Sequence, residues 1–145
     1  MTLIYVVLLA ALAVVLAPVT VKVADRAAGY PLAGIFIVAA GLLAKEFGTL
    51  STGEELSFSR TWVGDVVGTG IDVHFALRGD ALGVFFALLA LVIGAVVFTY
   101  SAAYLPKGKG NTSFYLLMTA FTMSILLLAL ANDVILLFFA WELVS

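Results

Sequence analysis

Cysteine is absent from this chain of 145 residues, and charged residues make up only 11% of it. The first absence excludes disulfides and thiolate metal sites. We also expect no metal site and no cofactor. The second separates the chain from water-soluble domains, in which about 25% of residues are charged. A net charge of −2 argues against nucleic acid as a partner. With 64% hydrophobic residues and a mean hydropathy of +1.22, the composition is that of an integral membrane protein.

Four stretches of the sequence contain no charged residue: 1–21, 27–44, 81–106 and 110–132. A helix needs about 20 apolar residues to cross the hydrocarbon core, so each stretch is long enough or close to it. Backbone N–H groups in lipid must be paired within their own segment, which favours helices over open sheet. The alternative for the first stretch is a cleaved signal peptide, but no basic residue precedes it and it is too long for a signal core. We therefore predict a retained helix.

The predicted fold class is an all-α, polytopic membrane protein with four full transmembrane helices, the start of a fifth, and a small extracytoplasmic β-hairpin. The helices are expected at Leu3–Val21, Ala27–Ala44, Ala81–Leu105, Ser113–Ala131 and from Val134 onward. This divides the chain into 1–44 with helices one and two, 45–80 as an external loop, and 81–145 with helices three, four and the first half of five.

The hairpin is predicted from Ile71–Leu77, where apolar and more polar residues alternate with the period of a strand. Thr61–Val63 is the expected partner strand, and Gly64, Gly68 and Gly70 mark a glycine-rich turn. We expect this hairpin to lie on the outer surface, between helices two and three.

Orientation follows from the lysines and arginines, because short loops rich in them stay cytoplasmic. Lys22 and Arg26 lie in the first connection, and Lys107 and Lys109 lie in the third. Alternating helices put these two loops on one side, so the N-terminus and the 45–80 segment are predicted to face outward. That segment holds six acidic residues against three basic ones, which agrees with the assignment.

The fifth apolar run, Val134–Ser145, has twelve residues and would cover about 18 Å of helix, well short of a hydrocarbon core of about 30 Å. The interpretation is that this polypeptide is the N-terminal piece of something longer, or that a second chain completes it.

Glu142 is the main candidate for chemistry, because it lies about 14 Å into this fifth helix among apolar and aromatic residues. A carboxyl at mid-bilayer costs on the order of 2.5–3.5 kcal/mol on insertion scales, and burial disfavours its charged form. Such a group can accept and release protons, so we predict a role in proton transfer. The alternative is a carboxyl held inert by hydrogen bonds to neighbouring helices. A cationic partner is needed and is expected beyond Ser145 or on another chain.

Two further carboxylates are candidates for an accessory polar or ion path. Asp133 begins the fifth helix, and Asp80 precedes the third. A helix cap explains Asp133 well, since an acid there accepts backbone hydrogen bonds and suits the helix dipole. Capping and interfacial pairing likewise explain Asp80 and its neighbour Arg78. His74, alone in an exposed strand, is expected to be a surface residue.

Small residues recur along helix three at Gly83, Ala87, Ala90 and Gly94. Residues of this size and spacing let helices approach closely in lipid, so they predict a packing stripe.

Three segments resemble one known family, the antiporter-like subunits shared by Mrp-type cation/proton antiporters and respiratory complex I. Asn132–Ser145 is similar to that family's fifth-helix motif, in which a membrane glutamate follows a tryptophan. Arg78–Leu89 resembles its Asp-Gly-Leu start of helix three, and Ile93–Leu105 adds a third match. The likeness is strongest to the large A subunit of the Mrp complex. This chain has Asn132-Asp133 where the family usually has Asp-Asn.

The resemblance implies a subunit of a multisubunit complex in the cell membrane, with other membrane subunits and the lipid bilayer as partners and Na+ and H+ as transported ions. It also implies that Glu142 pairs with a lysine on a later helix. Two alternatives stay open: a proton-pumping subunit of a complex I-type NADH/quinone oxidoreductase, and a structural membrane subunit. As part of a cation/proton antiporter, the protein is expected to be a secondary transporter subunit rather than an enzyme.

Overall fold

The computed structural model describes residues 1–50, 55–64, 73–108 and 111–145. Its elements, in chain order, are α1 (Thr2–Ala24), the 3-10 turn η1 (Asp25–Ala28), α2 (Gly29–Lys45), α3 (Phe47–Leu50), β1 (Leu56–Val63), β2 (Val73–Gly79), α4 (Ala81–Tyr104), α5 (Asn111–Leu130) and α6 (Val134–Val144).

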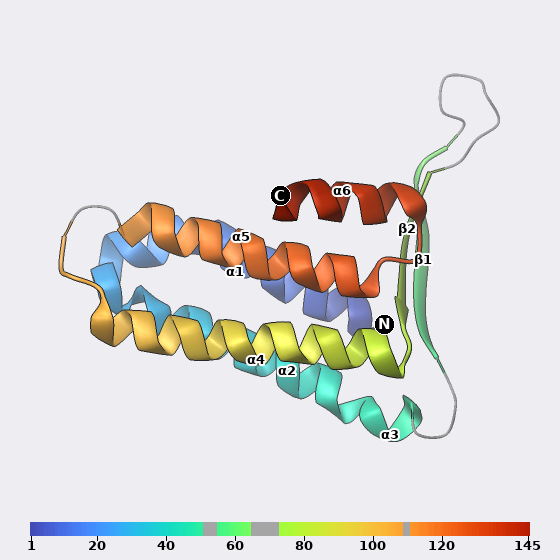
Figure 1. Cartoon of the computed structure of the whole chain (residues 1–145), viewed down its shortest axis with the longest axis horizontal. Helices are drawn as coiled ribbons and strands as arrows, with labels where there is room; N and C mark the ends of the chain where they lie inside the picture. Colours follow the sequence, from blue (N-terminus) through green and yellow to red (C-terminus); the bar gives the residue numbers. More distant parts are fainter. Residues whose placement is uncertain (51–54, 65–72, 109–110) are drawn as a thin grey trace.

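Long helices occupy the four charge-free stretches, and β1 and β2 pair as an antiparallel hairpin. The coarse prediction of a mostly helical membrane chain with a small hairpin is therefore confirmed. Among the described residues, three segments are long and apolar enough to cross a membrane: Thr2–Lys45, Ala81–Tyr104 and Asn111–Leu130. The first contains both α1 and α2, which run in opposite directions (Figure 1). Four full crossings and an outward hairpin remain predictions.

Several boundaries differ from the prediction by a few residues. The second long helix begins at Gly29 rather than Ala27, because Asp25 has a φ of 49° that interrupts the helix and a 3-10 turn follows. The short α3 was not expected, and the buried Leu50 holds its end against the bundle.

β1 begins at Leu56, well before the predicted Thr61. Its first residues alternate leucine and phenylalanine with serine, which is a strand pattern of period two. Gly68, Gly70, Ile71 and Lys109 lie outside the described residues.

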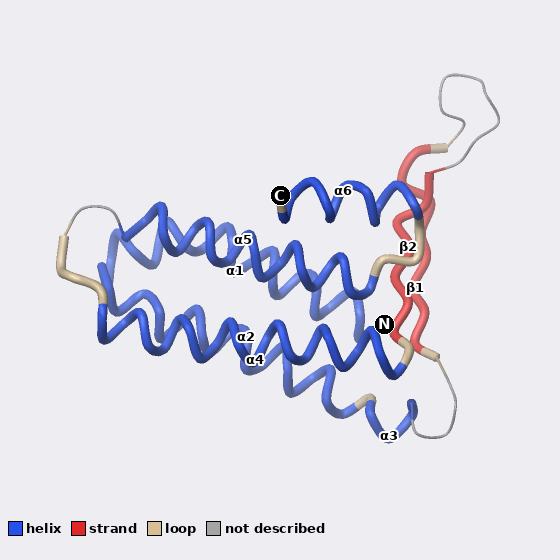
Figure 2. The backbone as a smooth tube through the Cα atoms, in the orientation of Figure 1, coloured by secondary structure: helices blue, strands red, loops and turns tan. Residues whose placement is uncertain are grey.

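The long helices lie side by side, and the hairpin stands across one end of them (Figures 1 and 2). The N-terminus lies at the hairpin end, whereas η1 and the α4–α5 connection lie at the opposite end. α6 starts at the hairpin end, turns back beside α5 and stops partway along the bundle. The basic loops and the hairpin are thus at opposite ends, as alternating helices require.

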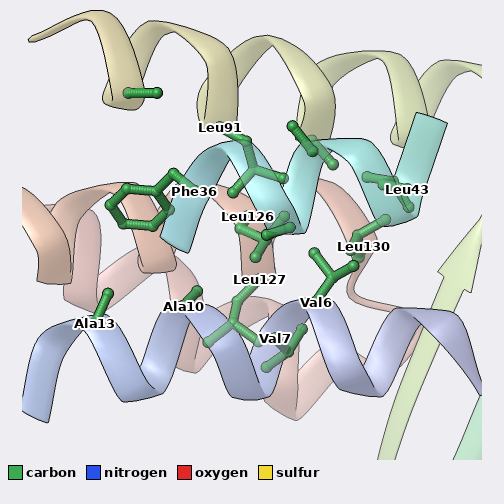
Figure 3. Packing of buried hydrophobic residues seen from close by; sticks show 14 of the residues in the cluster. Val6, Val7, Ala10, Ala13, Phe36, Leu43, Leu91, Leu126, Leu127 and Leu130 are labelled. Atoms are coloured by element: carbon green, nitrogen blue, oxygen red, sulfur yellow. The ribbon is translucent and has the colours of Figure 1, made fainter. Parts of the chain in front are cut away.

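Small and aliphatic side chains fill the core (Figure 3). Val6 and Ala10 of α1 are fully buried and face α5, whose Leu126 and Leu130 are also fully buried. Gly83 and Gly94 of α4 lie close to Ala129 and Thr122 of α5, so these two residues of the predicted packing stripe do lie at a helix–helix contact. Small residues at these contacts let the helices approach closely. The van der Waals packing between closely spaced helices favours their association in lipid.

Large apolar side chains cover the outside of the long helices, including Leu8, Val15, Ile37, Phe85 and Leu117, each more than half exposed. A soluble monomer rarely exposes a contiguous apolar patch of more than a few hundred Å². The outer surface is therefore suited to lipid or to the apolar faces of other membrane helices.

The end opposite the hairpin is held by polar contacts between two loops. The Asp25 carboxylate accepts hydrogen bonds from the N–H of Gly108 at 2.9 Å and from the side-chain amide of Asn111 at 2.8 Å. The Tyr115 hydroxyl donates to the Arg26 carbonyl at 2.7 Å. The left-handed backbone of Asp25 is thus maintained by its neighbours, and the two basic loops are fixed to each other.

Candidate functional site

The candidate site is α6, whose start is set by Asp133. One carboxylate oxygen of Asp133 accepts from the N–H groups of Ile135 at 2.8 Å and Leu136 at 3.4 Å. These are the orphan donors of a helix N-terminus, so the cap predicted for Asp133 is confirmed. Its role in an ion path stays a prediction.

Asp80 does the same for α4, because its carboxylate accepts from the N–H of Gly83 at 2.7 Å. Arg78 pairs with Glu55 rather than with Asp80, at 2.5 Å between Nη2 and Oε1. The hydrogen bond to Glu55, and then its charge, raise the pKa of the Arg78 guanidinium. The capping and the ion pairing predicted for Asp80 and Arg78 are therefore both confirmed, with Glu55, which directly precedes β1, as the partner of Arg78.

Glu142 lies near the end of α6, nine residues after Asp133 and about 14 Å along the helix axis. The residues of α6 that are buried, Leu136 and Ala140, form one stripe that packs on α5. Glu142 follows Ala140 by two positions, about 200° around the helix, so it points away from α5. Its side chain is exposed.

The surroundings of Glu142 are apolar and aromatic. Phe138 and Trp141 are 64% and 62% exposed, and they share the open side of α6 with the carboxyl. Among the described residues, no group forms a hydrogen bond or an ion pair with the Glu142 side chain. A lone carboxyl on an apolar helix face in a membrane needs a partner or a proton, because an unpaired charge in hydrocarbon is costly.

The structure brings Asp80 and Asp133 to the same end of the bundle, beside the hairpin, and leaves Glu142 apart from both. His74 is exposed in β2, opposite Thr61, as expected for a surface residue.

One contact was not predicted from the sequence: the N–H of Asn132 donates a hydrogen bond to the carbonyl of Ala76 at 2.9 Å. Leu77 also forms a β-bridge with Ala131, so the hairpin is attached to the start of α6. Only backbone groups make these contacts, and no residue pattern marks them.

Comparisons with known proteins agree with the geometry. Residues 62–115 match the family described as NADH-Ubiquinone oxidoreductase (complex I), chain 5 N-terminus. A protein of Staphylococcus haemolyticus named as antiporter subunit mnhA2 is 32% identical over 91% of this chain. A protein of Staphylococcus aureus (strain MRSA252) with the same name is 40% identical over 62% of it.

The fold also matches a chain in the structure of the Mrp complex from Dietzia sp. DQ12-45-1b, with a TM-score of 0.81 and 34% identity over 99% of this chain. The present chain spans 16% of the first relative's length and 15% of the Dietzia chain. The matching sequences, the matching fold and the tryptophan-glutamate segment all indicate the same family. The chain belongs to the antiporter-like family of Mrp A subunits, where it corresponds to an N-terminal segment.

Proposed function

We propose that the chain is part of a subunit of a multisubunit antiporter that exchanges Na+ for H+ across the cell membrane. The observation that carries this is the match to the Mrp complex over 99% of the chain at 34% identity. The partners are then the other membrane subunits of that complex, and the protein is a secondary transporter rather than an enzyme.

In this function Glu142 takes part in proton transfer. Its carboxyl stands on an open apolar face with no partner among the described residues. A proton arriving from the outer side neutralises the carboxylate, and a cationic group brought close favours its release again. Inward proton movement would drive Na+ outward. Asp80 and Asp133, both at the hairpin end, would supply polar groups near the outer surface.

The experiment is an antiport assay on the full subunit assembled with its partners. Everted vesicles from antiporter-deficient cells that express the complex should lose a preformed pH gradient when Na+ is added. Vesicles without the complex should keep it. Failure of Na+ to dissipate the gradient, with the complex assembled, would contradict the proposed exchange.

A second candidate function is favoured by the family match at residues 62–115, whose name refers to complex I. In that case proton movement would be driven by NADH oxidation through quinone reduction elsewhere in the complex. The same vesicles separate the two, because proton movement would then follow NADH oxidation and would not require Na+.

The orientation has its own test, since the chain has no cysteine. His74→Cys on the hairpin and Lys107→Cys in the opposite loop are both at exposed positions. With the N-terminus and hairpin outside, an impermeant thiol reagent added to intact cells should label position 74, and should label position 107 only after permeabilisation. The cysteine-free parent is the control. The reverse pattern would invert the proposed topology.

A further inference from the structure

The hairpin is bound to the connection between α5 and α6. The Asn132 N–H donates to the Ala76 carbonyl at 2.9 Å, and Leu77 and Ala131 pair in an antiparallel bridge. The other edge of β2 is taken by β1, so this connection lies along the remaining edge of β2, joined to it by one isolated bridge and one hydrogen bond. Ala76 and Leu77 are buried, so these backbone groups would cost free energy if their partners were lost.

The connection between α5 and α6 is short, and each of its residues is restrained. α5 ends at Leu130 and α6 begins at Val134. Each residue between them has its own restraint: Ala131 the bridge, Asn132 the hydrogen bond, and Asp133 the helix cap. The position and direction of the first turn of α6 are therefore set by the hairpin.

Within the described part of the chain, the rest of α6 is buried along one side. Of its eleven residues, Leu136 and Ala140 are the buried ones, and both lie in the stripe that faces α5. A helix is a stiff rod with a rise of about 1.5 Å per residue, so a shift or rotation at its start is carried to residues two turns later. Glu142 is one of those residues.

We propose that the hairpin is a positioning element for Glu142. By holding residues 131 and 132, β2 fixes the depth and the rotation at which α6 presents the carboxyl, although no described residue of the hairpin forms a hydrogen bond or an ion pair with it. This inference rests on the proposed role of Glu142 in proton transfer, and Asn132 acts through its backbone N–H rather than through its exposed side chain.

A matched pair of variants isolates that N–H. Asn132→Pro removes the donor while keeping an extended conformation at Ala131, which the bridge already requires. Asn132→Ala removes the side chain and keeps the donor. The first readout is a distance between spin labels at positions 74 and 143, on the hairpin and beyond Glu142, in the assembled complex with its other cysteines replaced. Asn132→Pro should broaden or shift the distance distribution, and Asn132→Ala should match the parent.

The second readout is the pH dependence of antiport. Per assembled complex, Asn132→Pro should lower the rate about three- to tenfold, the factor that corresponds to one hydrogen bond. Its pH profile should also be displaced, because the carboxyl then meets its partners at a different distance. A purely structural role would reduce the amount of complex and leave the pH profile of the remainder unchanged.

Cysteines at the bridged positions provide a second variant that does not depend on proline being tolerated. In Leu77→Cys/Ala131→Cys, oxidation locks the contact, and a positioning role predicts equal rates before and after oxidation. Loss of transport on oxidation would overturn the proposal, as would an Asn132→Pro complex with the parent's distance distribution and pH profile. Because the label distances need no transport, they decide the positioning claim even if Na+ fails to drive proton movement.

Discussion

Replacing Glu142 with glutamine should lower Na+-dependent proton transport by about tenfold or more, which corresponds to roughly 1.4 kcal/mol or more of added barrier. Glutamine keeps the size and the hydrogen-bonding atoms of the side chain but cannot bind and release a proton. The fold should survive, because the Glu142 side chain is exposed and makes no hydrogen bond within the described residues. The variant should insert slightly better, since a neutral amide is cheaper to bury than a carboxylate. The measurement is dissipation of a pH gradient in vesicles, normalised to assembled complex.

Two further variants define what the result means. Glu142→Asp should keep partial transport, because the acid remains and is withdrawn by about one methylene. Glu55→Gln is the matched control, because Glu55 is an exposed acid whose surface pair with Arg78 is screened by solvent, and this variant should leave the rate within about twofold. Full transport from a correctly assembled Glu142→Gln complex would show that the carboxyl is structural.

Much of the fold could be predicted because lipid imposes a simple rule on sequence. A stretch without charge and about 20 residues long has few alternatives to a helix, so α1, α2, α4 and α5 were found within a few residues of their ends. The hairpin was found from alternation in β2. Helix ends were less predictable, because the break before α2 depends on a single residue, Asp25, whose backbone is held by contacts with a distant loop.

The candidate site, too, could be predicted from the sequence only in part. Glu142 stands out in the sequence because it is the carboxyl within an apolar helical run, and the caps at Asp80 and Asp133 follow from acids that immediately precede helices. The face on which Glu142 lies requires the packing of α6 on α5, which the sequence of an almost uniformly apolar helix does not reveal. The attachment of Asn132 to Ala76 was equally hidden, because any non-proline residue carries the same N–H.

The glycines of α2 show most clearly what helix packing reveals beyond the sequence pattern. Gly29, Gly34 and Gly41 all lie in α2 and are indistinguishable by residue type. A Cβ at Gly34 or Gly41 would meet nothing within 4 Å. A Cβ at Gly29 would lie 2.2 Å from the backbone oxygen of Phe98 and 2.8 Å from the hydroxyl of Tyr115. The same residue is therefore obligatory at one position and replaceable at two.

Gly29→Ala should accordingly destabilise the subunit by about 3 kcal/mol, near the upper end for an overpacked core. The obstructing atom belongs to the backbone of α4, so relief requires α2 and α4 to separate. That movement would loosen the stacking of Phe98 on Phe36, whose ring centroids are 5.2 Å apart, and on Tyr115. Loss of the Tyr115 bond to the Arg26 carbonyl would add to the cost.

The measurement is the denaturant midpoint of the purified full subunit in mild detergent, with Gly34→Ala and Gly41→Ala as controls. The controls should be neutral or more stable by about 0.5–1 kcal/mol, because alanine loses less backbone freedom on folding than glycine does. A Gly29→Ala subunit as stable as these two would mean that α2 and α4 do not approach as closely as the structure has them. The Phe36–Phe98–Tyr115 stack, which depends on that approach, would then also be looser than its ring distances indicate.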